Sequence, residues 1–138
     1  MHVTRHAKVN PSWDLPKATE PGYSRVAWSL VGEDTGAQTS EVALVRLEPG
    51  NRSRGFHHHE TEETYVVLEG RLGVRTKGED EERILDRYDA AFFDPGEKHT
   101  YRCVGTEPVV LLSVHGGSEQ DMHRDRSLDV EEKYDLEQ

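Results

Sequence analysis

Short runs of β-favouring residues, separated by turn residues, follow one another along most of this 138-residue chain. The runs are rich in Val, Leu, Phe and Tyr, and Gly, Pro, Asn or Asp residues lie in many of the gaps between them. This spacing predicts an all-β domain, built as an antiparallel sandwich or barrel. The runs expected to form strands are residues 26–31, 41–47, 63–68, 72–76, 83–85, 90–93, 99–104 and 109–115.

The composition divides the chain into three parts. Residues 1–24 contain repeated prolines and few bulky apolar residues, so we expect an irregular N-terminal arm. Residues 25–117 hold the strand-like runs and are expected to form the barrel domain. Residues 118–138 are mostly charged and predict an acidic C-terminal tail.

The charge of the chain excludes several classes of partner. Lys and Arg number 17 against 27 Asp and Glu, which gives a formal net charge of −10. Nucleic acid and anionic membrane surfaces attract basic proteins, so we expect neither as a partner. The single cysteine, Cys103, precludes an intrachain disulfide and fits a reducing compartment. With no apolar leader or membrane-spanning run, the sequence predicts a soluble cytoplasmic protein.

Three histidines and a glutamate have the spacing of metal ligands carried by strands. His57 and His59 share a face only if the backbone is extended, and His58 then points the other way. Glu63 opens the next strand-like run, and His99 opens a later one. Neutral imidazole and carboxylate are common ligands of divalent transition metals. We therefore predict a metal centre; the alternative is a solvated run of surface histidines.

These residues also resemble the first motif of the cupin superfamily, in which a glycine precedes HxH, a glutamate and a second glycine. The match is His57-x-His59-x3-Glu63-x6-Gly70, with Gly50 one residue further away than usual.

The second cupin motif is matched less closely. Gly96 and His99 fit its second glycine and its histidine. Tyr88 stands at its first glycine, Asp94 at its first proline and Cys103 at its asparagine. None of these departures falls on a ligand, and the resemblance covers about residues 40–115.

The resemblance implies a small single-domain metal-binding cupin, with a jelly-roll barrel or sandwich of antiparallel strands. One divalent transition metal (Fe, Mn, Ni or Zn) would be held by His57, His59, Glu63 and His99. Such a ligand set leaves one or two positions open for water or substrate, as in catalytic rather than structural metal sites. Glu63 is the candidate catalytic residue, either as the fourth ligand or as a base.

Three further residues are candidates for substrate binding. Tyr65 is in phase with Glu63, and Tyr101 is in phase with His99, so both are expected to face the interior. A core tyrosine with a satisfied hydroxyl is the alternative for Tyr101. His115 ends the last strand, where it would either line the pocket or lie in solvent. Cys103, in the same phase, is expected to be an inert buried thiol.

The predicted function is that of a metal-dependent enzyme acting on an oxygen-rich small molecule. The metal would act as a Lewis acid or as an O₂-activating centre, so dioxygenase, isomerase, cyclase and lyase activities all remain open. The alternatives are a non-catalytic cupin that binds a metal and a small molecule, and a metal-independent barrel with a role in assembly.

The outward faces of two strands are apolar as well. Val66 and Leu68 lie on one, and Val110, Leu112 and Val114 lie on the other. Because such faces are usually covered, we expect a homodimer.

Overall fold

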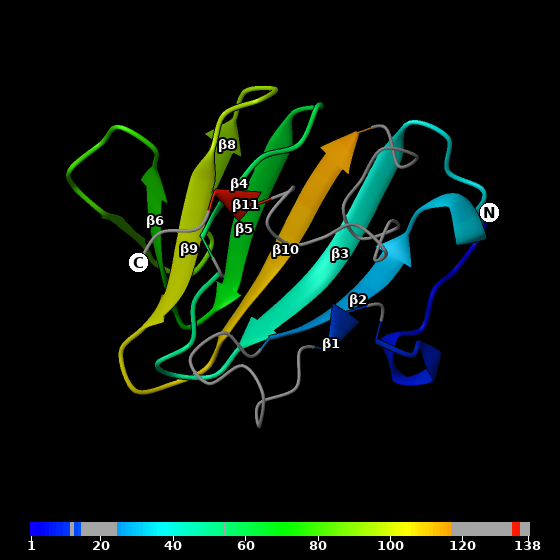
Figure 1. Cartoon of the computed structure of the whole chain (residues 1–138). Coiled ribbons are helices and arrows are strands. Elements are labelled where there is room, and N and C mark those ends of the chain that lie inside the picture. The colour runs from blue at the N-terminus through cyan, green and yellow to red at the C-terminus, as the bar shows by residue number, and fades with distance from the viewer. Residues whose placement is uncertain (12, 15–24, 54, 117–133, 136–138) are drawn as a thin grey trace.

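The computed structural model describes residues 1–11, 13–14, 25–53, 55–116 and 134–135, which form two antiparallel sheets facing each other (Figure 1). Two 3-10 helices, η1 (His6–Lys8) and η2 (Glu33–Thr35), lie in the same part of the chain. The six-stranded sheet has the order β1 (Trp13–Asp14), β2 (Val26–Val31), β3 (Ser40–Leu47), β10 (Val109–Gly116), β5 (Glu63–Glu69), β8 (Ala90–Phe93). The five-stranded sheet has the order β11 (Tyr134–Asp135), β4 (Phe56–His57), β9 (His99–Val104), β6 (Arg71–Thr76), β7 (Arg83–Leu85).

The all-β class and the eight strand-like runs predicted from the sequence are confirmed, and the two sheets form a sandwich. One detail differs from the expectation. Strand β4 ends at His57, so His59 lies just beyond it. The described residues of the expected N-terminal arm include η1 and the short edge strand β1. Most of the acidic tail lies outside the described residues. No described helix is long and apolar enough to cross a bilayer.

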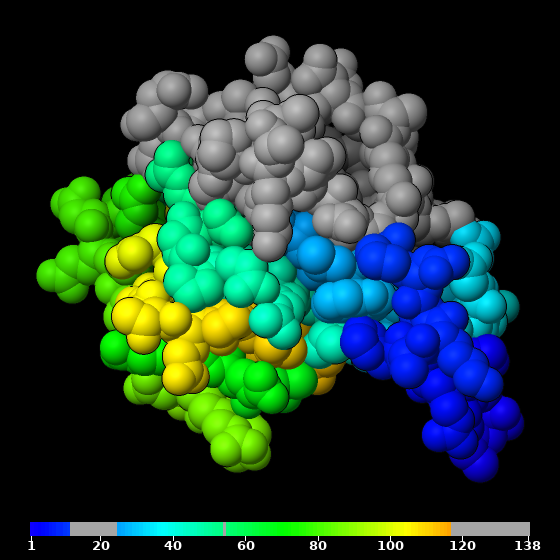
Figure 2. Space-filling model, turned by 90° about the horizontal axis from the view of Figure 1, so that it is seen from below, coloured from blue at the N-terminus to red at the C-terminus, as the bar shows by residue number. Residues whose placement is uncertain are grey.

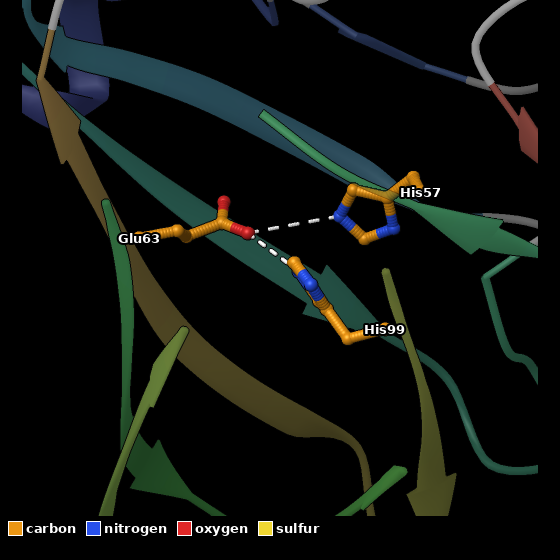
Figure 3. A group of neighbouring side chains, drawn as sticks. All are labelled: His57, Glu63 and His99. Carbon is orange, nitrogen blue, oxygen red and sulfur yellow. Dashed lines mark hydrogen bonds and ion pairs between the residues drawn. The ribbon is translucent and has the colours of Figure 1, made fainter. Parts of the chain in front are cut away.

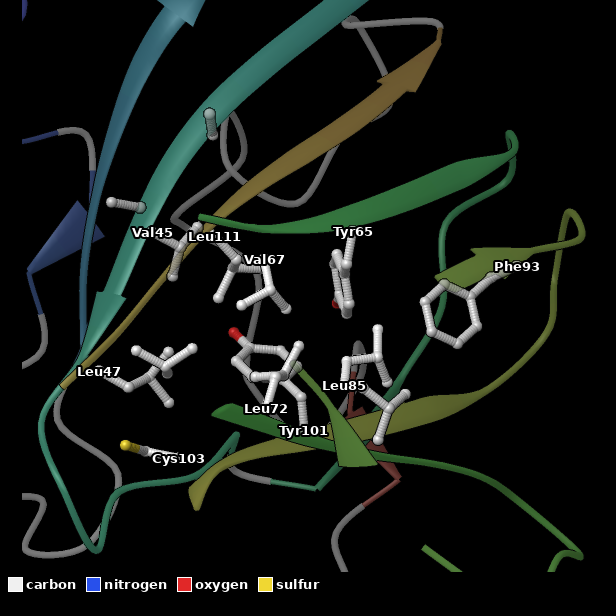
Figure 4. Close-up of a cluster of buried hydrophobic side chains, with 14 residues drawn as sticks. Val45, Leu47, Tyr65, Val67, Leu72, Leu85, Phe93, Tyr101, Cys103 and Leu111 are labelled. Carbon is white, nitrogen blue, oxygen red and sulfur yellow. The ribbon is translucent and has the colours of Figure 1, made fainter. Parts of the chain in front are cut away.

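Side chains alternate between the interior and the surface along the central strands. In β10 every second residue from Val109 to His115 is buried, and β3, β5 and β9 follow the same alternation. The inward-facing apolar side chains of both sheets meet as one core (Figure 4). Its fully buried members include Leu47, Val67, Leu72, Val109 and Leu111.

Strand register gives the sandwich a polar end and an apolar end. Glu41, His115, Glu63 and Phe93 are cross-strand neighbours in one row across β3, β10, β5 and β8. The next inward row holds Ala43, Ser113, Tyr65 and Ala91, and the row after it holds Val45, Leu111 and Val67. The ionisable residues therefore gather at one end, above layers that become progressively more apolar.

The N-terminal segment packs on β2. The Thr4 hydroxyl donates to the backbone oxygen of Leu30 at 2.6 Å, and the His6 ring meets Trp28 edge-on at 4.6 Å between centroids. Figure 2 shows these first residues lying against the neighbouring surface of the sandwich. The outer face of the six-stranded sheet is thus partly covered by the chain itself.

Gly70 and Tyr88 are two of the described turn residues with left-handed backbone. Gly70 joins β5 to β6 with φ +77°, and an added Cβ would collide with the backbone oxygen of Pro108. Tyr88 has φ +73°, which only a few per cent of non-glycine residues adopt. Tyr88 stands where the second cupin motif has its first glycine, so the turn keeps the glycine conformation without the glycine.

We predict that Gly70→Ala lowers the free energy of unfolding by about 3 kcal/mol or more, because it combines a backbone collision with a left-handed φ. The matched control is Gly78→Ala, whose φ is +94° but whose added Cβ meets nothing within 4 Å. The control should lose only the conformational cost, about 1–2 kcal/mol. Urea unfolding of both variants measures the difference, and equal losses would contradict the collision.

Candidate metal centre

The side chains of His57, His59 and His99 all approach the carboxylate of Glu63. The Nε2 atom of His99 lies 2.7 Å from Oε1, and the Nε2 atom of His57 lies 3.7 Å from the same oxygen (Figure 3). The Nε2 atom of His59 lies 3.0 Å from the other oxygen, Oε2. All four residues are at least nine-tenths buried. The four ligands expected from the sequence therefore lie together.

Strand pairing explains this convergence. His57 in β4 is the cross-strand neighbour of His99 in β9, so these two rings leave the five-stranded sheet side by side, with centroids 4.3 Å apart. Glu63 reaches them from the opposite sheet. His59 is held by its backbone, because the N–H of Gly96 donates to the oxygen of His59 at 2.8 Å. His58 is exposed, as the alternation predicted.

His115 joins the cluster from the last strand of the six-stranded sheet. It is 3% exposed, which decides against the solvent position considered for it from the sequence. Its ring stacks on His59 with centroids 4.8 Å apart and an angle of 12°. Its Nδ1 atom lies 4.0 Å from Oε2 of Glu41.

Two overlapping sets of donor atoms have the closeness that a metal ion requires. One set is His57, Glu63 and His99, and the other is His59, Glu63 and His115; within each set the ligand atoms lie within 4.8 Å of one another. Glu63 belongs to both and presents one oxygen to each histidine group. The sequence had grouped His59 with His57 and His99 and had left His115 outside the ligands.

Burial and hydrogen bonding fix the charge of these groups. Burial raises the pKa of the Glu63 carboxyl, but hydrogen bonds with His57, His59 and His99 outweigh it and hold that pKa well below its ordinary value. Burial, with the neighbouring His99, lowers the pKa of His57 to about 3. An ionised carboxylate beside a neutral imidazole is the protonation state in which both bind metals.

The orientation of His99 provides a test of whether a cation fits. Its Nδ1–H donates to the backbone oxygen of Glu97 at 2.8 Å, and its ring stacks on Phe93 with centroids 3.8 Å apart. In the neutral ring, Nε2 is then an acceptor, and it faces the Glu63 oxygen, also an acceptor, at 2.7 Å. Only a proton or a cation makes this contact favourable. A backbone-anchored imidazole of this kind is typical of metal-binding histidines.

The remaining candidates line or support the same centre. The Tyr65 hydroxyl lies 3.1 Å from Nε2 of His57 and 3.1 Å from Nε2 of His99. The Tyr101 ring is buried and lies edge-on to His57 at 5.7 Å.

Cys103 is buried in the apolar core, its pKa is raised by burial, and its thiol donates to the Glu107 backbone oxygen. Its burial agrees with the sequence prediction, and its raised pKa is the property from which low reactivity was expected.

Sequence reasoning missed several residues around the centre. The Ser113 hydroxyl donates to Oε2 of Glu63 at 2.8 Å, Phe93 stacks on His99, and Glu41 faces His115. Arg25, just before β2, is also buried close by, with its guanidinium 5.7 Å from the centre of the Tyr101 ring. Ser113 could have been found, because it lies two residues before His115 and therefore on the same face of the strand. The positions of Phe93, Glu41 and Arg25 depend on which strands pair, and the sequence does not give that pairing.

Comparison with known proteins agrees with this fold. The family description "Cupin domain" matches residues 43–115. The "Tetracenomycin polyketide synthase protein TcmJ" of Streptomyces glaucescens is 27% identical over 110 residues, which span 80% of this chain and 71% of that protein.

Two solved structures are similar in fold. The polyketide cyclase RemF from Streptomyces resistomycificus superposes with a TM-score of 0.70 at 21% identity, over 84% of this chain and 79% of its own. A predicted oxalate decarboxylase from Thermotoga maritima superposes with a TM-score of 0.69 at 22% identity, over 84% of this chain and 99% of its own.

Proposed function

Because this chain belongs to the cupin family, we propose that it is a metal-dependent enzyme that acts on an oxygen-rich small molecule. The observation that carries the proposal is the convergence of three imidazole Nε2 atoms on one buried, ionised carboxylate. Among the activities open from the sequence, we favour a cyclase or lyase reaction without net redox change.

The ligands are His57, His59, Glu63 and His99, and they suit one divalent ion of Fe, Mn, Ni or Zn. When bound, such an ion supplies Lewis-acid stabilisation of negative charge on a substrate oxygen. The protein's own contribution is to keep the ligand side chains oriented. Phe93 and the Glu97 backbone oxygen fix the His99 ring, and the Ser113 hydroxyl fixes the Glu63 carboxylate. Glu63 serves as the fourth ligand or as a base for a substrate proton.

Tyr65 and His115 stand on either side of these ligands and are proposed to bind the substrate. The Tyr65 hydroxyl, between the rings of His57 and His99, can donate to a substrate oxygen. His115 lies against the outer side of His59, with Glu41 beside it. Tyr101 completes the wall next to His57.

The choice of non-redox chemistry rests on the similar proteins. RemF is called a polyketide cyclase, TcmJ is a polyketide synthase protein, and the Thermotoga maritima protein is called a predicted oxalate decarboxylase. Their names point to substrates with several carbonyl, carboxylate or phenolic oxygens. We propose a substrate of that chemical class here, a polyketide-like polycarbonyl compound.

Metal analysis tests the centre. Protein purified without chelators is expected to hold about one equivalent of a transition metal. His57→Ala and His99→Ala should each reduce the content at least tenfold, since even the loss of a residue that only hydrogen-bonds a metal ligand typically costs about 10–100-fold in affinity. His58→Ala is the matched control, because His58 is exposed between two buried ligands.

His115→Ala separates the two histidine groups in the same measurement. We expect it to keep its metal, because His115 is assigned to the substrate. Loss of metal in His115→Ala together with retention in His99→Ala would indicate that the ion binds to His59, Glu63 and His115 instead. Absence of metal from the wild-type protein would contradict the proposed metal centre.

Anaerobic turnover tests the class of reaction. We expect a metal-loaded sample to convert an aromatic 1,3-diketone or a related polycarbonyl compound under argon, with a cyclised or cleaved product seen by mass spectrometry. The Glu63→Gln variant should lose at least about a hundredfold in rate, as for removal of a general base. Oxygen uptake with the same compounds by iron-loaded protein would instead support a dioxygenase. Tight binding without any product would support a non-catalytic cupin.

We also propose a homodimer formed through the outer face of the six-stranded sheet. Leu44, Leu112 and Val66 are cross-strand neighbours on this face, and Phe92 at its edge is 55% exposed. Leu112→Glu should convert the dimer to a monomer in sedimentation velocity at micromolar concentration. Ile84→Glu, on β7 of the other sheet, is the control and should leave the mass unchanged. A monomeric wild-type protein would contradict the proposal.

A further inference from the structure

A small cavity lies directly beside the metal centre. Its volume is about 10 Å³, which is room for roughly one water-sized group. The walls combine centre residues with residues of the apolar core and one arginine: Arg25, Val45, His57, Glu63, Tyr65, Tyr101, Leu111 and Ser113. The cavity therefore admits the reacting oxygen of a ligand rather than a whole molecule.

Arg25 brings a permanent positive charge to this cavity. The residue is only 5% exposed, and a guanidinium does not lose its proton in proteins. Its Cζ atom lies 5.7 Å from the centre of the Tyr101 ring, close enough for a cation–π contact. Tyr101 in turn lies edge-on to His57. The arginine thus lines the cavity next to Tyr101, which in turn adjoins His57.

Arg25 lines this cavity together with His57 and Glu63, two of the proposed metal ligands. A negatively charged ligand oxygen in the cavity would therefore lie near the guanidinium as well as near a bound metal ion. Attraction to two positive charges favours an anionic oxygen over a neutral one.

From this cavity and its buried arginine, we propose that the centre recognises an anionic oxygen ligand, a carboxylate or an enolate, with Arg25 as the residue that selects for the negative charge. The inference rests on the proposed function, because the metal would be the second positive charge beside the cavity. The charged oxygen of the substrate occupies the cavity, where the metal ligands His57 and Glu63 and the Arg25 side chain are among the lining residues.

Formate, a one-carbon carboxylate, is a suitable probe. Its binding is followed by the line width of ¹³C-formate in NMR, with zinc-loaded and with metal-free protein. We expect binding to the zinc-loaded form, weaker binding to the metal-free form, and a loss of about ten- to a hundredfold in affinity for Arg25→Met in the zinc-loaded form. Arg25→Lys, which keeps the charge but not the planar fork, should lose less than Arg25→Met.

The matched control is Arg46→Met. Arg46 is the exposed cross-strand neighbour of Val26, one residue from Arg25, and pairs with Glu48 at the surface. It should bind formate as the wild type does. Zinc content and melting temperature are measured for each variant, and Arg25→Gln replaces Arg25→Met if the latter does not fold.

The outcomes separate the two proposals. Equal formate affinity in the wild type and Arg25→Met, with zinc retained in both, overturns the role of Arg25 and leaves the metal centre standing. If the wild type retains no zinc, the proposed function fails, and the titration of metal-free protein then tests the anion site alone. Formate binding by the wild type that is lost in Arg25→Met would support an anion site at Arg25. No formate binding by the metal-free wild type would overturn that site.

Discussion

The carboxylate of Glu63 is the interaction on which the functional end of the sandwich depends. Its two oxygens point to different partners, Oε1 to His57 and His99 and Oε2 to His59 and the Ser113 hydroxyl. One side chain from β5 thereby ties together β4, β9, β10 and the segment after β4. Burying an ionised carboxylate is costly unless it is paired and hydrogen-bonded. Here three of the pairing groups, the rings of His57, His59 and His99, are also the proposed metal ligands.

The rest of the fold places this cluster by strand register. The row Glu41, His115, Glu63 and Phe93 lies across the end of the six-stranded sheet, and His57 and His99 face it from the other sheet. Shifting any of these strands by one residue would turn its member of the row outward, because side chains alternate. The apolar rows beneath, from Val45 and Leu111 to Leu47 and Val109, resist such shifts by their burial.

The sequence was informative where function depends on spacing within a strand and less so where it depends on pairing between strands. His57, His59 and Glu63 could be predicted because alternation fixes their relative directions, and the motif resemblance added His99. Arg25 and Glu41 gave no such signal, since arginine and glutamate side chains are usually exposed. His115 was ambiguous for the same reason: only the pairing of β10 with both β3 and β5 shows that it lies between two buried glutamates.

The turn at Tyr88 shows how the fold tolerates departures from the motif. Tyr88 keeps φ +73° because its neighbours on both sides are fixed: its N–H donates to the Val67 backbone oxygen at 2.7 Å, and the N–H of Asp89 donates to Asp86 at 3.0 Å. The turn leads directly into β8, which carries Phe93, and Phe93 stacks on His99. The conformation that costs energy at Tyr88 is therefore retained because it sets the start of the strand that orients a ligand.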